Sequence, residues 1–353
     1  MSALPDIPWK VGFEIELMAP PGASRQTLAE RLATDIGGTS TPYWHVQSEP
    51  SRVPGMPVFH NLTQGFRIEV DGQWMASCVD DITLQNGLDR QRPPLPGWFR
   101  IVSDDLRLLR LIQRHATPTG AIADALTPVA DLFGVQATSA EGGLVRVADA
   151  SGASVCLGAP LPGERERPCE LVTAPLSTKH HAILTGWLEA AQQLGFRQAH
   201  EAAVHVHCDG AALKHPVVFQ RLVRLWHRHG SAFRALVKTN PACMRLGPWP
   251  VQVVTQILSP TTRSQTWDEL VATLVPMGLT KYCDLNIANL VLGVRNKPTV
   301  EFRVFPGSMD ASQIVAFGHL AAAVCAAAVQ DVDDDTLIDL PTLAPEARTL
   351  LEP

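Results

Sequence analysis

The chain reads VGFEIELMAP over residues 11–20, an apolar run that carries two carboxylates, Glu14 and Glu16. In a β-strand, successive side chains point to opposite faces of the sheet, so these two acids share one face. Phe13 and Ile15 share the other face. Like charges that stand side by side are destabilising without compensation. The stretch therefore predicts a strand with a buried apolar face, whose acidic face either meets solvent or holds a positive group.

Three later segments repeat this alternation of ionisable and apolar residues. They read CELVT at 169–173, AVHVHCD at 203–209 and TVEFRVF at 299–305. In each predicted strand the ionisable residues fall on one face and the apolar residues on the other. If the four strands share one sheet with its apolar side under helices, the opposite side gathers a set of ionisable groups. This set consists of Glu14, Glu16, Glu170, His205, His207, Glu301 and Arg303.

Such a face has the chemistry of a divalent metal site. Carboxylates with one or two imidazoles are ligands for Mg²⁺ or Mn²⁺, and several acids could hold two or more metals that bridge phosphate oxygens. The metals would repel Arg303 unless an anion lay between them. A guanidinium is suited to bidentate contact with phosphate. Taken together, the four strands favour a site for metal and phosphate.

Each pattern also has a purely structural interpretation. An alternating strand face with charges is commonly solvated. The pair of His205 and His207, taken alone, is more typical of structural positions than of a metal site. Glu301 and Arg303 could form a surface ion pair worth less than about 1 kcal/mol. Only the coincidence of four strands raises the functional interpretation above these alternatives.

Composition indicates a globular chain. Of its 353 residues 46% are hydrophobic and 18% are charged, which suffices for a substantial core. A formal charge of −6 without a long basic stripe argues against a nucleic-acid partner. The apolar run at 314–329 contains Gly318 and His319 and is too short to span a bilayer comfortably, so we expect no membrane partner.

The seven cysteines and the start of the chain bear on the compartment. Seven is an odd number and there is no CxxC pair, which predicts reduced thiols. The start of the chain lacks a basic segment followed by an apolar core, so we expect no signal peptide and a cytoplasmic location. The oligomeric state stays open.

The order of predicted elements favours an α+β fold with a mainly antiparallel sheet. Alternation and turn signals predict strands and turns over 43–85, with a hairpin at Asp71-Gly72, a second hairpin over 142–158, and a late strand over 281–290. Helical periodicity predicts helices over 23–38, 103–116, 121–132, 177–195, 213–230 and 311–329. We expect one catalytic domain over 1–353 with a helical insertion at about 88–140.

Five segments together resemble the amidoligase family, a group of carboxylate–amine ligases similar to glutamine synthetase and glutamate–cysteine ligase. The segments are GFEIEL at 12–17, CELVTAPL at 169–176, HVHCD at 205–209, YCDLNI at 282–287 and TVEFRVFPGSMD at 299–310. The resemblance implies a glutamine synthetase-like catalytic fold. In such a fold, helices pack on the convex face of the sheet and the concave face holds Mg·ATP.

The resemblance also implies roles for individual residues. The metal ligands it implies are Glu14, Glu16, Glu170, His205 and Glu301. Catalysis would involve Glu301 and Arg303, with Arg303 meeting the transferred phosphoryl group. His207, Asn286 and Arg303 would bind the nucleotide.

These implications predict an ATP-dependent ligase that uses Mg²⁺ or Mn²⁺ and joins a small-molecule or peptide carboxylate to an amine through an acyl phosphate. The chain has no GxSxG and no GxxxxGK[ST] motif, so serine hydrolases and P-loop enzymes lose support. Two alternatives stay open. One is a metal-dependent hydrolase built on the HxH pair and the acids, and the other is a non-catalytic nucleotide-binding module.

Overall fold

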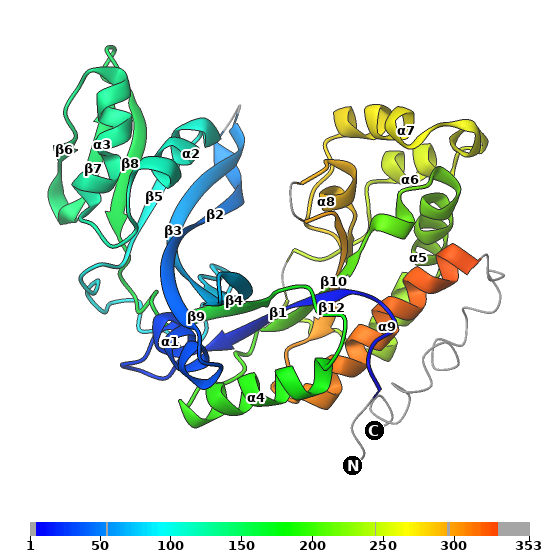
Figure 1. Ribbon diagram of the computed structural model, residues 1–353. Coiled ribbons are helices and arrows are strands. Elements are labelled where there is room, and N and C mark those ends of the chain that lie inside the picture. The colour runs from blue at the N-terminus through cyan, green and yellow to red at the C-terminus, as the bar shows by residue number, and fades with distance from the viewer. Residues whose placement is uncertain (1–4, 54–55, 244, 295–296, 331–353) are drawn as a thin grey trace. The chain divides into compact units, whose positions relative to one another are not determined.

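The computed structural model describes residues 5–53, 56–243, 245–294 and 297–330. The chain divides into two compact units, which we describe separately (Figure 1). Unit 1 contains residues 1–16, 173–189 and 198–353, and unit 2 contains residues 17–172 and 190–197. Each unit combines an antiparallel sheet with helices, so the predicted α+β class is confirmed.

The sheet of unit 1 runs in the order β1-β10-β12-β11. Its strands are β1 (Val11–Met18, of which the last two residues belong to unit 2), β10 (Ala203–Asp209), β12 (Thr299–Pro306) and β11 (Leu285–Asn286). All three pairings are antiparallel. The register sets Glu14 opposite His205, His207 opposite Glu301, and Asn286 opposite Glu301. Segments far apart in the sequence therefore meet side by side.

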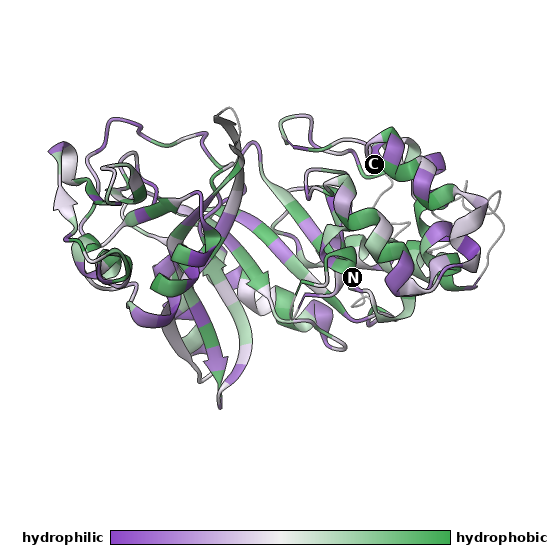
Figure 2. Ribbon diagram, turned by 90° about the horizontal axis from the view of Figure 1, so that it is seen from above, coloured by the Kyte–Doolittle hydropathy of each residue, from purple (hydrophilic) through white to green (hydrophobic). Residues whose placement is uncertain are grey.

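Unit 1 has six α-helices among the described residues. They are α4 (His180–Gln193, whose last four residues belong to unit 2), α5 (Pro216–Leu236), α6 (Val251–Leu258), α7 (Trp267–Leu274), α8 (Ala288–Val291) and α9 (Ala311–Gln330). In Figure 1, α9 packs against β10, and α5 packs against α9. The Phe302 ring of β12 lies 5.4 Å from the Trp226 ring of α5. Figure 2 shows that hydrophobic and hydrophilic residues alternate along these strands.

Helix α9 is the one helix among the described residues that is long and apolar enough to cross a membrane. In the structure, 72% of its most apolar window is buried inside the protein. The side chains of Ile314, Phe317 and Cys325 are fully covered. A buried core helix passes the same test of length and composition, and this helix is mostly buried.

The sheet of unit 2 runs in the order β9-β4-β3-β5-β8-β7-β6, with β2 paired to β3. Its strands are β2 (Thr39–Val53), β3 (Met56–Val70), β4 (Gln73–Val79), β5 (Phe99–Ser103), β6 (Thr138–Ser139), β7 (Val145–Ala148), β8 (Ser154–Pro160) and β9 (Pro168–Thr173, of which Thr173 belongs to unit 1). The long strands β2 and β3 curve together (Figure 1). Asp71 and Gly72 join β3 to β4 and both have positive φ, as a two-residue hairpin turn requires.

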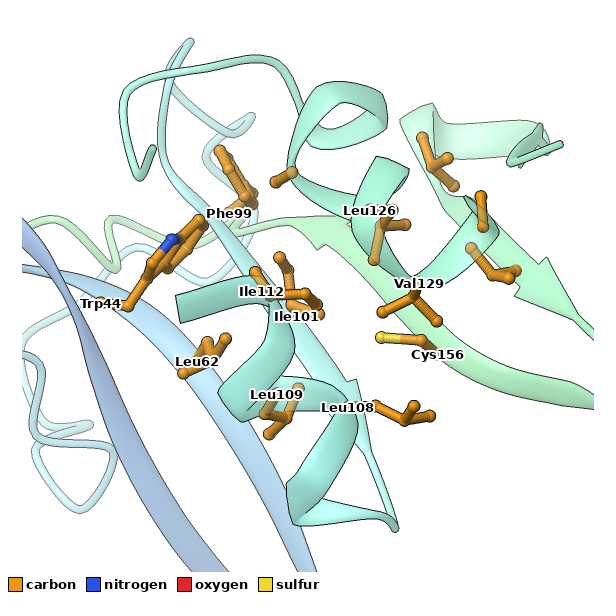
Figure 3. Close-up of a cluster of buried hydrophobic side chains, with 14 residues drawn as sticks. Trp44, Leu62, Phe99, Ile101, Leu108, Leu109, Ile112, Leu126, Val129 and Cys156 are labelled. Atoms are coloured by element: carbon orange, nitrogen blue, oxygen red, sulfur yellow. The ribbon is translucent and has the colours of Figure 1, made fainter. Parts of the chain in front are cut away.

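Helices α1 (Arg25–Asp35), α2 (Leu106–His115) and α3 (Ile122–Phe133) belong to unit 2. Figure 3 shows the core that α2 and α3 form with the sheet. Trp44, Leu62 and Ile101 point from three neighbouring strands toward Leu109 and Val129 of these helices. One face of the β2-β3-β5 region is therefore apolar and covered by helices.

Most predicted elements are confirmed within a few residues, including all six helices and both hairpins. The predicted strand over 281–290 is wrong for most of its length, because only Leu285–Asn286 is a strand and Ala288–Val291 is helical. Strand β5 and helices α6 and α7 were not predicted. The single domain over 1–353 with a helical insertion at 88–140 stays a prediction, as does the glutamine synthetase-like fold.

Candidate functional site

The acidic pair of β1 lies beside the first histidine of β10. The His205 Nδ1 atom is 3.2 Å from Glu14 Oε2, and its Nε2 atom is 3.5 Å from Glu16 Oε1. The other oxygen of Glu16 accepts a hydrogen bond of 2.7 Å from the Ala203 backbone N–H. All three ionisable side chains are buried. The His205 imidazole therefore lies between the two acids. The sequence pattern predicted either solvent or a positive group at this place.

The second histidine of β10 lies between Glu14 and Glu301. His207 Nε2 is 3.0 Å from Glu14 Oε1 and 3.9 Å from Glu301 Oε1. His207 Nδ1 is 3.1 Å from the Thr299 hydroxyl, which holds the ring in place. Glu14 Oε1 also accepts a hydrogen bond of 2.6 Å from the Lys297 ammonium. One carboxylate oxygen thus meets both an imidazole and an ammonium group.

Glu301 connects this cluster to Arg303 and Asn286. Its Oε1 atom accepts a hydrogen bond of 2.7 Å from Arg303 Nη1, and its Oε2 atom accepts one of 2.7 Å from Asn286 Nδ2. The Asn286 carbonyl oxygen in turn accepts the Ala288 backbone N–H. Asn286 is thus fixed at both ends of its amide, and Glu301 is held by two donors.

The charges of the cluster are set by burial and by neighbours. Burial raises the pKa of Glu14, but the Lys297 ammonium and His207 lower it by more, so the pKa lies well below its ordinary value. Burial also raises the pKa of Glu301, yet Arg303 and His207 bring it down to about 2. Burial lowers the pKa of His205, and Arg303 lowers it further. Glu14 and Glu301 are therefore held in the ionised state, which is the state in which a carboxylate binds a metal.

The arrangement fits a divalent cation. One ligand atom each from Glu14, His207 and Glu301 lies within 4.8 Å of the others. The buried His207 Nε2 is close to Glu14 but not aligned for a hydrogen bond, and it has no hydrogen-bond partner among the residues that the structure describes. A metal ion would give this nitrogen a partner, while Thr299 orients the ring as outer-shell partners do. Oxygen ligands with one imidazole suit Mg²⁺ or Mn²⁺.

The predicted site residues are thus placed as follows. Six of them gather in unit 1, and they are Glu14, Glu16, His205, His207, Glu301 and Arg303, with Asn286 hydrogen-bonded to Glu301. Glu170 is half-buried on β9 in unit 2. The assignment of each residue to metal, nucleotide or catalysis stays a prediction.

Sequence reasoning missed Lys297, which lies just before β12 and contacts Glu14. It also missed Asp284, whose buried carboxylate accepts hydrogen bonds from Arg234 Nη1 and from the Gly247 backbone N–H. The Asp284 carbonyl accepts the backbone N–H of Arg303. Asp284 thus ties β12 to α5 and to the segment around Gly247. Its place in YCDLNI, two residues before Asn286, was a signal that could have found it.

Comparison with known proteins gives one family. The family model described as "Putative amidoligase enzyme" matches residues 7–325, which covers most of the chain. No curated protein and no solved structure matches.

Proposed function

Since this chain belongs to the amidoligase family, we propose that it is an ATP-dependent carboxylate–amine ligase that forms an amide through an acyl phosphate. The observation that carries the proposal is the cluster of Glu14, His207 and Glu301 with Arg303 beside it. A ligase of this kind needs a metal site next to a guanidinium, since it must neutralise charge on a transferred phosphoryl group. A glutamine synthetase-like arrangement of the sheet belongs to the same proposal.

In this proposal Glu14, His207 and Glu301 hold a Mg²⁺ or Mn²⁺ ion. The predicted ligands Glu16 and His205 lie beside Glu14 and belong to the same metal chemistry, whereas His207, which was expected to bind the nucleotide, is proposed here as a metal ligand. The metal role of Glu170 stays a prediction. When bound, such an ion neutralises charge on the phosphates of ATP and holds them in line for transfer.

Arg303 is the residue proposed to contact the transferred group. It is nearly buried, its Nη1 donates to Glu301, and its Nε has no hydrogen-bond partner among the described residues. Burial lowers the pKa of Arg303, but Glu301 raises it by more, so the guanidinium stays charged. Glu301 positions it, and Nε remains for an anion. Asn286, which also donates a hydrogen bond to Glu301, is proposed to contact the nucleotide.

The reaction has two steps. A carboxylate oxygen of the acid substrate attacks the γ-phosphorus of ATP, and ADP leaves as the acyl phosphate forms. The nitrogen of the amine then attacks the acyl carbon, inorganic phosphate leaves, and the amine loses a proton to give the amide. Both steps need charge neutralisation and positioning more than a protein nucleophile, which agrees with the absence of such a motif from the sequence.

The proposal is tested by measuring ADP release from Mg·ATP with pooled carboxylic acids and amines. We expect ADP release that needs both an acid and an amine, and a turnover at least about 100-fold lower in Arg303→Met. Arg110→Met, at an exposed position of α2, is the control that keeps full turnover.

Absence of ADP from every pool with folded protein would contradict ligation. Two further measurements, activity without nucleotide and nucleotide binding, separate the alternatives. A hydrolase would act without nucleotide, whereas a binding module would bind nucleotide and release no ADP.

A further inference from the structure

Unit 2 has a polar sheet face opposite its apolar core. The register sets Gln47 of β2 opposite Asn61 of β3, and Thr63 of β3 opposite Arg100 of β5. Asn61 and Thr63 are two residues apart, so the four side chains share one face. Leu62 lies between them and points to the core of Figure 3. Residues directly opposite in neighbouring strands have Cα atoms about 4.5–5.5 Å apart, so Gln47 is a neighbour of Asn61, and Thr63 is a neighbour of Arg100.

Each of the four side chains has a buried polar atom that lacks a hydrogen-bond partner among the described residues. These atoms are Gln47 Oε1, Asn61 Oδ1, Thr63 Oγ1 and Arg100 Nε. Asn61 and Thr63 are completely buried, whereas Gln47 and Arg100 keep part of their surface open. A buried polar group without a partner costs about 1–3 kcal/mol, so four neighbouring ones need an explanation.

The two amides have a defined orientation. Gln47 Nε2 donates to the Asp80 backbone carbonyl, and Asn61 Nδ2 donates to the Gln47 backbone carbonyl. Because the nitrogens are used in this way, the amide oxygens are the atoms left for a ligand. With the Thr63 hydroxyl they form a set of three acceptors. An ammonium group, which has three N–H donors, matches such a set.

The charge beside this face favours an anion as well. The buried Asp80 carboxylate is shared by Arg165 at 2.7 Å, Arg100 at 2.9 Å and Arg25 at 3.7 Å. Even with the neighbouring Asp81, the guanidiniums outnumber the carboxylates. An ammonium group alone would be repelled by this excess positive charge, so its ligand should carry a carboxylate too. Arg100 belongs both to the ion cluster and to the polar face. Its Nη2 donates a hydrogen bond to Asp80, while its Nε has no hydrogen-bond partner within the described part of the chain.

We propose that the face formed by Gln47, Asn61, Thr63 and Arg100 binds an α-amino acid, with its ammonium group on the three oxygens and its carboxylate on Arg100. This inference goes beyond the proposed function, because it assigns unit 2 a binding site of its own. Binding itself needs only unit 2. Gln47 and Arg100 are the partly exposed members of this set.

The test measures the thermal unfolding midpoint of the full chain with each common α-amino acid at about 10 mM. At least one should raise the midpoint by about 2 °C or more. The matched amine without the carboxylate and the matched acid without the amine should each raise it far less. No shift with any amino acid, or equal shifts with the half-molecules, would overturn the proposal and leave bound water as the partner of these atoms.

Variants then locate the binding. Thr63→Val removes the hydroxyl with little change of shape, and it should weaken amino-acid affinity about tenfold or more, as should Arg100→Met. Arg146→Met, at an exposed position of β7, should leave the affinity unchanged. Unchanged affinity in Thr63→Val overturns the site even if Arg100→Met does not fold.

The failures of the two proposals are distinguishable. Binding of an amino acid without ADP release from any acid pool contradicts the ligase and keeps this site. ADP release from acids and amines, together with an amino-acid affinity that is unchanged in Thr63→Val, keeps the ligase and overturns this site.

Discussion

A single oxygen, Glu14 Oε1, accepts a hydrogen bond of 2.6 Å from the Lys297 ammonium and lies 3.0 Å from His207 Nε2. In the protein alone, Lys297 therefore supplies positive charge on an atom proposed to bind a metal. Its side chain is 42% exposed, so it can move aside without disturbing the core.

Lys297→Met should accordingly strengthen divalent metal binding, because an incoming ion no longer competes with an ammonium. We expect Mn²⁺ affinity to rise about tenfold, as measured by electron paramagnetic resonance titration at neutral pH. Lys214→Met, an exposed lysine after β10, is the matched control and should change nothing. Weaker Mn²⁺ binding in Lys297→Met would mean that the lysine supports the metal site instead.

Asp80 is one residue through which the stability of unit 2 depends on pH. Burial raises its pKa, but Arg165, Arg25 and Arg100 lower it by more, so the pKa lies below the ordinary value of 3.8. A group whose pKa is lowered by folding stabilises the protein above its unfolded pKa. That stability is lost as the pH falls through the folded pKa.

Asp80→Asn should therefore lower the free energy of unfolding by about 3–5 kcal/mol at neutral pH, since three guanidiniums lose their carboxylate. Its stability should also fall less steeply than that of the wild type below about pH 3.8. Urea unfolding over a pH series measures both effects. A variant as stable as the wild type at pH 7 would show that the ion cluster contributes little.

Among the elements, α9 shows how closely a helix approaches the sheet of unit 1. A Cβ atom at Gly318 would lie 2.4 Å from Ile7 Cδ1 and 3.2 Å from Phe13 Cζ. Gly186 of α4, by contrast, has no atom within 4 Å of such a Cβ. One glycine is required by close packing and the other is not.

Gly318→Ala should destabilise the protein by about 1–3 kcal/mol, because the added methyl group overpacks the contact with β1. Gly186→Ala should stabilise it by about 0.5–1 kcal/mol through its effect on helix propensity. Chemical unfolding of both variants provides the comparison. Equal effects at the two positions would contradict the close approach of α9.

The element scale also explains what could be predicted from sequence. The alternation in β1, β10 and β12 depends only on local geometry, so it correctly placed the apolar side chains under helices and the ionisable ones opposite. The alternation also indicated that Glu14 and His205 share one face if their strands share a sheet, but the register that sets them opposite each other is a long-range property that no local pattern gives. Lys297 lies outside any periodic element, and no local rule marks it.

The polar face of unit 2 was missed for a related reason. Asn61 and Thr63 belong to a long strand whose polar residues resemble a solvated face in sequence. Only the structure shows that both side chains are buried. Only the structure also shows that Asn61 Oδ1 and Thr63 Oγ1 have no hydrogen-bond partner among the described residues. Strand β5 escaped prediction because it is short and follows a Pro-rich stretch.

At the scale of the whole chain, the family match over 7–325 includes residues of both units. The proposed metal site lies in unit 1, and the proposed amino-acid site lies in unit 2. The role of Glu170, the binding of a nucleotide and the cytoplasmic location of the protein stay predictions. The central proposal is that Glu14, His207 and Glu301 bind one divalent ion.

Electron spin echo measurements on the Mn²⁺-loaded protein test that claim most directly, because they detect a histidine nitrogen bonded to the metal. We predict a nitrogen coupling that is lost in His207→Gln, together with much weaker Mn²⁺ binding in Glu14→Gln and Glu301→Gln. A protein that binds Mn²⁺ equally well in all three variants, with no histidine coupling in the wild type, would contradict the account.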